Sequence, residues 1–243
     1  MIMDDPLRIG ILYPLHSAED DYPWLAAHLV PPAQVHIAHT QATDLHTVEM
    51  CLQTGDQQHL LPGIEELRPY GVQVCLFACT SGSFAYGLEG ARHQAARITS
   101  ALAVPAASTS LAFLSATQAL GLKRVAVAAS YPENLATAFR AFLAEGGIEV
   151  VQMGCLGIWS GAEVGSLERD AVLHFVSQND HPDAEAVLIP DTAMHTVAFL
   201  PDLEAHVGKT VLTANQVTMW EALRLGERLT PQSDLGSLFA LSS

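Results

Sequence analysis

A cysteine at the end of an apolar run is the residue of this sequence best placed for chemistry. Cys79 follows the apolar segment Val74–Ala78 and precedes the small residues Thr80–Ser83, three of which carry hydroxyl groups. Where a strand passes into a helix, free backbone N–H groups and the helix dipole stabilise a thiolate. The same N–H groups can bind a substrate carboxylate. The run therefore predicts a nucleophile and an anion site within a few residues of each other.

The first half of the chain is echoed in the second half. Arg8–Pro14 ends in Tyr-Pro, and so does Arg124–Pro132. About 60–66 residues after each Tyr-Pro, an apolar run ends in a short polar segment, at Cys79 in one case and at Asp191 in the other. A period that occurs in matched segments is typical of repeated structural units. The echo predicts two homologous lobes that bring Cys79 and Asp191 to opposite sides of one cleft.

Short apolar or β-branched runs alternate with amphipathic stretches, which indicates βαβ units and an α/β fold with parallel sheets. The predicted strands are Ile9–Tyr13, Val35–His39, Val72–Ala78, Ala106–Ala107, Val125–Ala129, Val150–Met153, Ala186–Ile189 and Thr210–Leu212. The predicted helices are Val48–Leu67 (interrupted by Gly55 and Pro62), Gly90–Ala101, Leu111–Leu120, Leu135–Glu145, Ser166–Gln178 and Val217–Leu225.

Division of the chain into lobes follows from this order of elements. Residues 1–112 together with 213–243 are predicted to form the first lobe, which carries Cys79. Residues 113–212 are predicted to form the second lobe, which carries Asp191. The segment Leu111–Leu122 is expected to cross between them, and the C-terminal stretch to return to the first lobe.

Composition and charge exclude several classes of partner. The formal net charge of −15 argues against binding to nucleic acid or to an anionic membrane. No apolar run reaches the roughly 20 residues that a membrane span needs, and the start of the chain lacks the features of a signal peptide. The sequence predicts a cytoplasmic protein; a homo-oligomer is compatible with its size.

Cysteines and histidines give no cofactor or metal signature. Four cysteines are too few for a disulfide scaffold, and Cys51, Cys75 and Cys155 are interpreted as core residues. His36 and His39 are three residues apart, but neither Cys-x-x-Cys nor His-Glu-x-x-His occurs, so no metal site is predicted. The glycine patterns of dinucleotide and P-loop sites are also missing from the sequence.

Over nearly its whole length the chain resembles the aspartate/glutamate racemase superfamily, in the branch of arylmalonate decarboxylase and maleate cis-trans isomerase. The segments that carry the resemblance are Ile9–Pro14, Cys79–Ser83, Ala119–Val127 with Tyr131, Leu156–Ile158 and Asn215–Trp220. The resemblance implies two Rossmann-like lobes related by a pseudo-dyad, with the active site in the cleft between them. It also implies chemistry on a small carboxylic acid that needs neither a metal nor an organic cofactor.

The resemblance also implies roles for individual residues. Cys79 matches the first catalytic position of the family, and Asp191 stands where this branch normally carries a second catalytic cysteine. The residues that match the groups binding the substrate carboxylate are Thr80, Ser81, Tyr131, Thr192 and Ala193. The asparagines that maleate isomerases use on the second carboxylate have no counterpart in Leu15–Ser17 or Ser160–Ala162. A symmetric two-thiol racemase is therefore disfavoured.

Three classes of function remain open. The first, which the sequence favours, is an isomerase or racemase acting beside a carboxylate. In it Cys79 is nucleophile or base, and Asp191 is a proton donor whose protonated form desolvation favours. The second is a decarboxylase of a malonate-type acid in which Cys79 is the proton donor. The third is a carboxylate-binding protein without turnover.

Simpler interpretations of the same residues stand beside these. Asp191 follows a predicted strand and is suited to capping the next helix. Cys79 is also explained as a buried thiol, and Tyr131 as a residue that packs under the loop. Ser81 as a hydrolase nucleophile is disfavoured because the run around it is not the Gly-x-Ser-x-Gly elbow.

Overall fold

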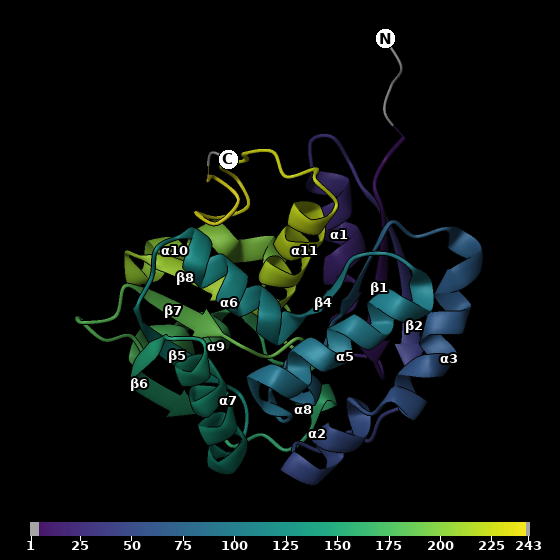
Figure 1. Cartoon of the computed structure of the whole chain (residues 1–243). Coiled ribbons are helices and arrows are strands. Elements are labelled where there is room, and N and C mark those ends of the chain that lie inside the picture. The colour runs from purple at the N-terminus through teal and green to yellow at the C-terminus, as the bar shows by residue number, and fades with distance from the viewer. Residues whose placement is uncertain (1–4, 242–243) are drawn as a thin grey trace.

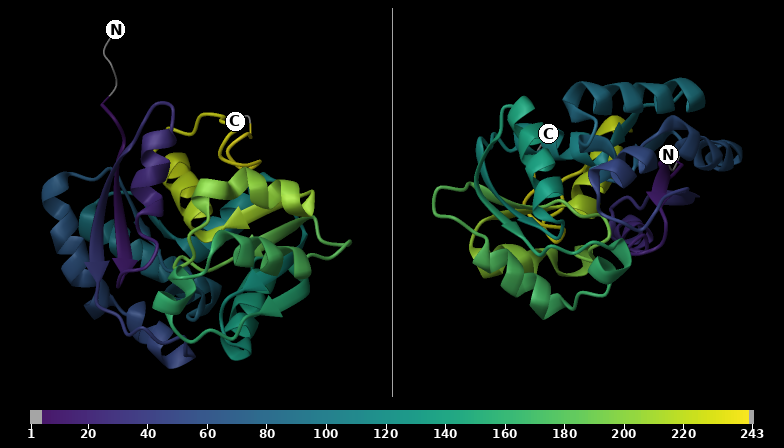
Figure 2. Two further views of the ribbon diagram at one scale, coloured as in Figure 1. Left: turned by 180° about the vertical axis from the view of Figure 1, so that it is seen from behind. Right: turned by 90° about the horizontal axis from the view of Figure 1, so that it is seen from below.

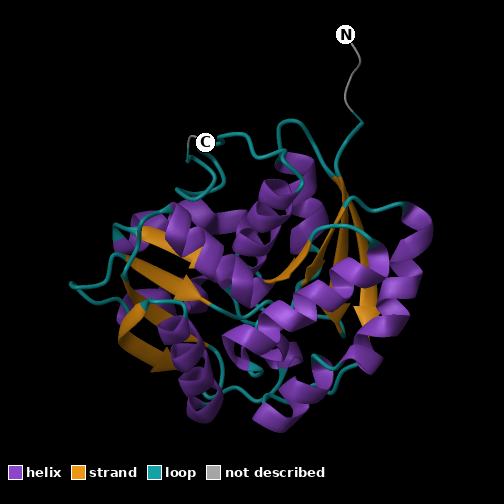
Figure 3. Cartoon of the chain, viewed as in Figure 1, coloured by secondary structure: helices purple, strands orange, loops and turns teal. Residues whose placement is uncertain are grey.

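The computed structural model describes residues 5–241 and contains two four-stranded parallel sheets (Figures 1 and 3). The first sheet has the order β2-β1-β3-β4, formed by β1 Arg8–Pro14, β2 Gln34–Thr40, β3 Val74–Phe77 and β4 Ala106–Ser108. The second has the order β6-β5-β7-β8, formed by β5 Arg124–Ala129, β6 Glu149–Cys155, β7 Ala186–Ile189 and β8 Thr210–Thr213. The identical strand orders agree with the echo in the sequence and with the predicted α/β fold of two lobes.

Helices cover both sheets. Those up to β4 are α1 Asp21–His28, α2 Val48–Thr54, α3 Gln57–Leu67, α4 Ser81–Phe84 and α5 Gly87–Leu102. Those after β4 are α6 Thr109–Ala119, α7 Glu133–Glu145, α8 Gly161–Gly165, α9 Arg169–Gln178, α10 Leu200–Val207 and α11 Ala214–Leu225. The central strands β3 and β7 are buried at every position, which parallel strands with both faces covered require. Sequence reasoning missed α1, α4, α8 and α10.

The predicted helix over residues 48–67 is interrupted at one of its two expected positions. Gly55 separates α2 from α3, but Pro62 lies inside α3. Proline removes one backbone hydrogen bond, to the carbonyl of Gln58. Gln58 and Pro62 are both exposed, so water can satisfy that carbonyl, and the helix continues. The interruption predicted at Pro62 is wrong.

The predicted helix Ser166–Gln178 is also wrong in its first part. Ser160 caps the short helix α8 by accepting a hydrogen bond from the Glu163 N–H, and Ser166 is the residue that ends α8. The following helix, α9, begins only at Arg169. The serine at the start of the apolar pattern therefore closes one helix rather than opening the next.

Helices α6 and α11 pack against each other and join the two halves (Figures 1 and 2). Their contact includes a buried hydrogen bond of 2.7 Å between the hydroxyls of Thr109 and Thr218. Helix α11 also contacts α1, β3 and β4 of the first half and β8 of the second. The boundaries of the two lobes remain a prediction. Within residues 5–241, no helix is long and apolar enough to cross a membrane.

Candidate active site

A pocket of about 70 Å³ lies where the carboxyl ends of strands from both sheets meet. In parallel sheets this edge is the usual place of a ligand site. Tyr13 and Pro14 come from the end of β1, and residues that follow β3, β5 and β7 form much of the remaining wall. The predicted site residues that line the pocket are Cys79, Ser81, Tyr131, Asp191, Thr192 and Ala193. Thr80 is buried behind the wall and does not line it.

The Cys79 thiol is buried at the end of β3 and has weak polar contacts. Its Sγ accepts a hydrogen bond of 3.3 Å from the Gly82 N–H and lies 3.8 Å from Ser81 Oγ. A Cβ on Gly82 would stand only 3.0 Å from this sulfur, so glycine permits the close approach of the backbone. Burial and the nearby Cys51 raise the pKa of Cys79 to about 12, against the lowering effect of Gly82 and Ser81. Cys79 is therefore a protonated thiol at neutral pH in this pocket.

The turn that carries Cys79 is held from behind by the junction of α2 and α3. The Gln94 side-chain amide of α5 donates to the carbonyls of Gly55 and Gly82, at 2.7 and 3.0 Å. A Cβ on Gly55 would stand 1.9 Å from the Gly82 carbonyl oxygen. The glycine that separates α2 from α3 is therefore also required for the fit against the Cys79 loop.

On the opposite wall, both carboxylate oxygens of Asp191 accept hydrogen bonds. Oδ1 accepts from the Ala193 N–H at 2.9 Å, and Oδ2 accepts from the Ser130 hydroxyl. Asp191 is 4 % exposed, so these two bonds replace hydration that burial removes. No helix begins directly after Asp191, since the next helical residues are Val197–Phe199. The predicted helix cap is therefore not observed: Asp191 closes a local turn and is tied to Ser130, just after β5.

Two tyrosines at equivalent strand ends are engaged in buried hydrogen bonds. The Tyr131 hydroxyl donates to the Pro190 carbonyl at 2.6 Å, and the Tyr13 hydroxyl donates to the Thr192 carbonyl at 3.0 Å. Burial raises the pKa of both phenols well above the ordinary value. Each hydroxyl has a single proton, so neither is free to donate to a substrate in this arrangement. Both tyrosines instead fix the backbone of the Asp191 turn.

The donors that remain available for an anion are on opposite walls. The backbone N–H groups of Ser81 and Thr192 donate no hydrogen bond to any other described residue, and both residues line the pocket. The Ala193 N–H is already used by Asp191, and the Thr80 hydroxyl has no bond of regular geometry within residues 5–241. The Tyr131 N–H likewise donates no hydrogen bond to another described residue. Of the predicted carboxylate-binding residues that line the pocket, three therefore have free backbone N–H donors, Ser81, Tyr131 and Thr192, and Ala193 does not.

Two residues that line the pocket, Cys51 and Tyr13, and one that supports its wall, Ser130, were not predicted from the sequence. Cys51 of α2, interpreted as a core residue, lines the pocket, and burial raises the pKa of its thiol to about 11. Ser130 directly precedes Tyr131 of the Tyr-Pro echo. This position was the only feature of the sequence that could have pointed to it. Tyr13 belongs to the same echo, but was not assigned a role.

A loop of the first half and a loop of the second meet over the pocket. Asp44 accepts hydrogen bonds from the Ser160 hydroxyl at 2.6 Å and from the Gly161 N–H at 2.5 Å. The His46 N–H donates to the Trp159 carbonyl at 2.7 Å. Figure 1 shows α2 and α8, which lie next to these loops, at the same end of the molecule. The pocket is thus closed from the side of these two loops.

Comparison with known proteins gives the family. The family model described as arylmalonate decarboxylase matches residues 29–239, and the chain belongs to this family of enzymes. A curated arylmalonate decarboxylase from Bordetella bronchiseptica is 27 % identical over 163 residues, which cover 65 % of this chain and 67 % of that protein. The predicted branch of the superfamily is confirmed, and so is the prediction of an enzyme.

Solved structures show the same fold. A maleate isomerase from Pseudomonas putida has a TM-score of 0.86 and 23 % identity, and the match covers 97 % of this chain and 99 % of that one. A maleate cis-trans isomerase mutant from Nocardia farcinica, with a covalently bound succinylcysteine intermediate, has a TM-score of 0.89 and 20 % identity, covering 98 % and 100 %. A liganded arylmalonate decarboxylase mutant, with glycine changed to cysteine and cysteine to serine, has a TM-score of 0.86 and 23 % identity, covering 97 % and 99 %.

Proposed function

We propose that this enzyme is a cofactor-independent decarboxylase of a small malonate-type acid, in which the Cys79 thiol protonates the α-carbon. The observation that carries the proposal is the contrast between the two walls. Cys79 is a buried thiol that retains its proton, whereas the Asp191 carboxylate is already bound by Ser130 and Ala193. One wall thus offers an available proton donor and the other does not. Membership of the arylmalonate decarboxylase family supports the same reaction.

The steps follow from the groups in the pocket. The N–H groups of Ser81 and Thr192 bind the carboxylate that is retained. The other carboxylate leaves as CO2, and the electron pair of the broken C–C bond passes to the α-carbon and into the retained carboxylate as an enediolate. Preorganised N–H donors stabilise the charge that develops there. The Cys79 S–H then gives its proton to the α-carbon, and the thiolate recovers a proton from water.

A thiol with a raised pKa is suited to this step. An enediolate is a strong base, so it takes a proton even from a weakly acidic thiol. A thiolate nucleophile or base would require Cys79 to lose its proton first, which burial opposes. The thiol therefore fits the donor role more directly than the nucleophilic role.

The pocket also favours a small substituent on the substrate. Its volume of about 70 Å³ is well below the roughly 150 Å³ of an engineered cavity that holds benzene. We infer that a small substituent on the substrate fits this pocket better than an aryl ring.

Isomerisation or racemisation is the second candidate, with Cys79 as nucleophile or base and Asp191 as proton donor. The observation in its favour is that the two side chains line the same pocket from different sheets. It requires Asp191 to carry and release a proton while its oxygens accept bonds from Ser130 and Ala193. For this reason it takes second place. A binding protein without turnover is not proposed, because the chain belongs to a family of enzymes.

Incubation in D2O separates the two candidates. Purified enzyme is supplied with methylmalonate, ethylmalonate, phenylmalonate, maleate or a single enantiomer of an α-substituted acid, and is followed by NMR. For a decarboxylase we expect CO2 release from the alkylmalonates, with a single deuterium at the α-carbon and slower turnover of phenylmalonate. Prolonged incubation should neither racemise the chiral acid nor add further deuterium. Fumarate from maleate, or α-deuteration without CO2, would instead establish the second candidate.

A further inference from the structure

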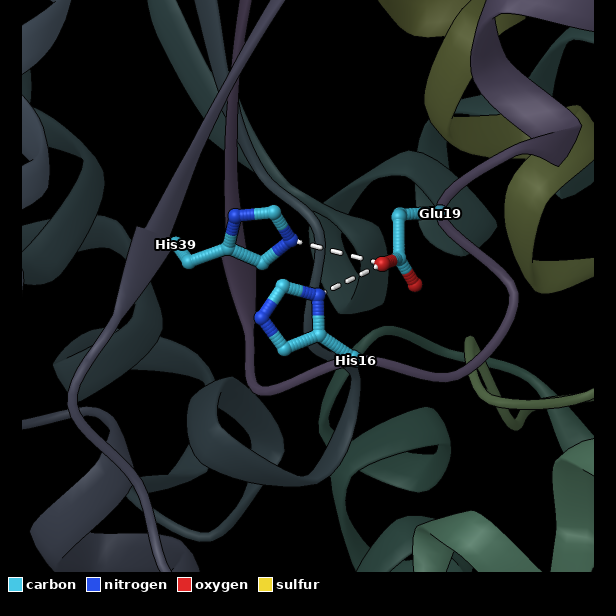
Figure 4. A group of neighbouring side chains, drawn as sticks. All are labelled: His16, Glu19 and His39. Atoms are coloured by element: carbon cyan, nitrogen blue, oxygen red, sulfur yellow. Dashed lines mark hydrogen bonds and ion pairs between the residues drawn. The ribbon is translucent and has the colours of Figure 1, made fainter.

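Two histidines and a glutamate converge, as Figure 4 shows, and one of them, His16, lines the pocket. His16 and Glu19 lie in the loop after β1, and His39 lies on the adjacent strand β2. In the register of the two strands, Tyr13 stands opposite His39, so the loop that leaves β1 turns over the end of β2. The parallel pairing therefore brings together three residues that are separated by up to 23 positions in the sequence.

The ligand atoms of this group all point to one place. Glu19 Oε1 lies 2.9 Å from His16 Nδ1 and 3.4 Å from His39 Nε2. All three ligand atoms lie within 4.8 Å of one another, and the two imidazole centroids are 3.9 Å apart. Neighbouring ligands of a tetrahedral zinc ion with bonds near 2.05 Å are about 3.3 Å apart. The two distances to Glu19 are close to this value, so binding requires small side-chain movements.

The surroundings hold these side chains in place. The second carboxylate oxygen of Glu19, Oε2, accepts a hydrogen bond of 2.6 Å from the Ser17 N–H. The Tyr13 ring contacts His39 edge-on, with centroids 6.4 Å apart. Partial burial raises the pKa of Glu19, but the hydrogen bonds from Ser17, His16 and His39 outweigh it and hold this pKa below the ordinary value.

We propose that His16, Glu19 and His39 form a site for a divalent transition-metal ion, with Zn²⁺ as the best match. Two imidazole nitrogens and one carboxylate are a ligand set typical of zinc, with water in the remaining position. Magnesium and calcium are disfavoured because they prefer oxygen ligands. No motif in the sequence predicts this site, because its ligands are brought together only by strand pairing. The sequence had predicted no metal.

The site has a direct connection to the second half of the molecule. His16 lines the pocket, and the next residue, Ser17, donates to the carbonyls of Gly161 and Ala193 at 2.9 and 3.1 Å. An ion bound to His16, Glu19 and His39 would fix the loop from which Ser17 makes these contacts. Its expected role is to hold the rim of the pocket, and the proposal does not depend on which reaction the enzyme catalyses.

Metal binding to the full chain tests the proposal. Chelator-treated protein at pH 7.5 is titrated with Co²⁺, whose visible absorbance reports the coordination geometry, and is then titrated with Zn²⁺ in competition. Equilibrium dialysis with elemental analysis gives the stoichiometry. We expect one Zn²⁺ per chain and a higher Tm in the presence of zinc, because an ion that binds only the folded state stabilises it. His39→Ala and Glu19→Gln should each weaken binding by at least about tenfold.

His93→Ala is the matched control. His93 and Glu89 form an exposed histidine–glutamate pair, 4.0 Å apart, with no third ligand among residues 5–241. This variant should bind zinc as the wild type does and keep the zinc-dependent rise in Tm. Should His39→Ala fold poorly, the more exposed His16→Ala serves in its place. Less than one ion per chain, or equal zinc affinity in wild type, His16→Ala and Glu19→Gln, overturns the proposal and leaves a hydrogen-bonded cluster only.

Discussion

The two strand ends that face each other across the pocket occupy equivalent places in the repeat but differ in how their polar groups are satisfied. At the end of β3, Cys79 has one long hydrogen bond from Gly82 and a distant hydroxyl neighbour. At the end of β7, Asp191 has one hydrogen bond to each carboxylate oxygen. Buried groups with full hydrogen bonding are costly to rearrange, whereas a weakly bound thiol is free to exchange a proton. The proposed function accordingly places the chemistry at the first strand end and support at the second.

The turn that contains Asp191 is hydrogen-bonded to residues of both halves of the molecule. The Thr192 carbonyl accepts from the Tyr13 hydroxyl of β1 and from the Asn215 side chain of α11, at 3.0 and 3.2 Å. The Tyr131 hydroxyl fixes Pro190 just before Asp191. The Asp191 turn is therefore a rigid wall against which a substrate held by the Thr192 N–H can be placed. Positioning of this kind is a large part of catalysis.

Substitution of Cys79 is expected to have the largest effect on catalysis. Cys79→Ser replaces the proton donor by a hydroxyl that is a much weaker acid, so we expect a loss of about 10²–10⁴-fold in kcat. The rate of CO2 release from an alkylmalonate measures the effect, and the Tm checks that the variant is folded. Cys155, which the sequence analysis interpreted as a core residue, is exposed in the structure. Cys155→Ser is therefore the control and should keep the wild-type rate. A Cys79→Ser enzyme with more than a tenth of wild-type activity would remove the thiol from the mechanism.

Substitution of Asp191 tests whether the opposite strand end supports the structure rather than the chemistry. Asp191→Asn replaces one of the two accepting oxygens by an NH2 group, which cannot accept the hydrogen bond from Ser130 or from the Ala193 N–H. We expect the free energy of unfolding to fall by about 2–3 kcal/mol. We expect kcat to fall by less than about tenfold, because Asp191 supports the wall and transfers no proton. Urea denaturation and the CO2 assay measure the two effects.

Ser130→Ala completes a double-mutant cycle with Asp191→Asn. Because the two side chains share one hydrogen bond, their effects on stability should be less than additive. Their effects on kcat should both be small. A loss of more than 10²-fold in kcat for Asp191→Asn, with little loss for Ser130→Ala, would show that the carboxyl takes part in proton transfer, as isomerisation requires.

The sequence predicted the parts of the site that depend on strand ends. The Tyr-Pro echo and the two runs that end at Cys79 and Asp191 were enough to place these residues on opposite walls, because parallel strands fix where their carboxyl ends lie. The apolar runs also gave every strand of both sheets to within three residues at each end. These features are local in sequence, or repeat at a fixed spacing.

The parts that were missed depend on contacts between distant segments. Cys51 enters the pocket because the junction of α2 and α3 packs closely against the Cys79 loop at Gly55, which no pattern in the sequence records. Asp44 meets Ser160 and Gly161 from loops more than 100 residues away. Tyr131 was matched to the substrate, but its hydroxyl is used by the Pro190 carbonyl. The type and the position of the site residues could be predicted from the sequence. The hydrogen-bond partner of each polar atom could not.

Asp21 is a second buried aspartate, and its hydrogen bonds differ from those of Asp191. Asp21 of α1 accepts from the Asn215 amide at 2.9 Å and from the Thr196 N–H at 3.2 Å, both through Oδ2. Burial nevertheless raises the pKa of Asp21 to about 6, and the two hydrogen bonds only partly offset it. Asp191, in contrast, has a bond to each of its oxygens. Asp21 therefore represents a buried carboxyl with one oxygen left without a donor among the described residues.

The raised pKa of Asp21 has a consequence for stability. A carboxyl whose folded pKa exceeds its unfolded value, about 3.9, stabilises the fold at low pH, and this contribution is lost as pH rises through about 6. Between pH 5 and pH 7 wild type should lose about 1 kcal/mol relative to Asp21→Asn, which cannot ionise. Urea denaturation at the two pH values measures the difference, with the exposed Asp183→Asn as control. Equal pH dependence in wild type and Asp21→Asn would show that the pKa of Asp21 is not raised in the folded protein.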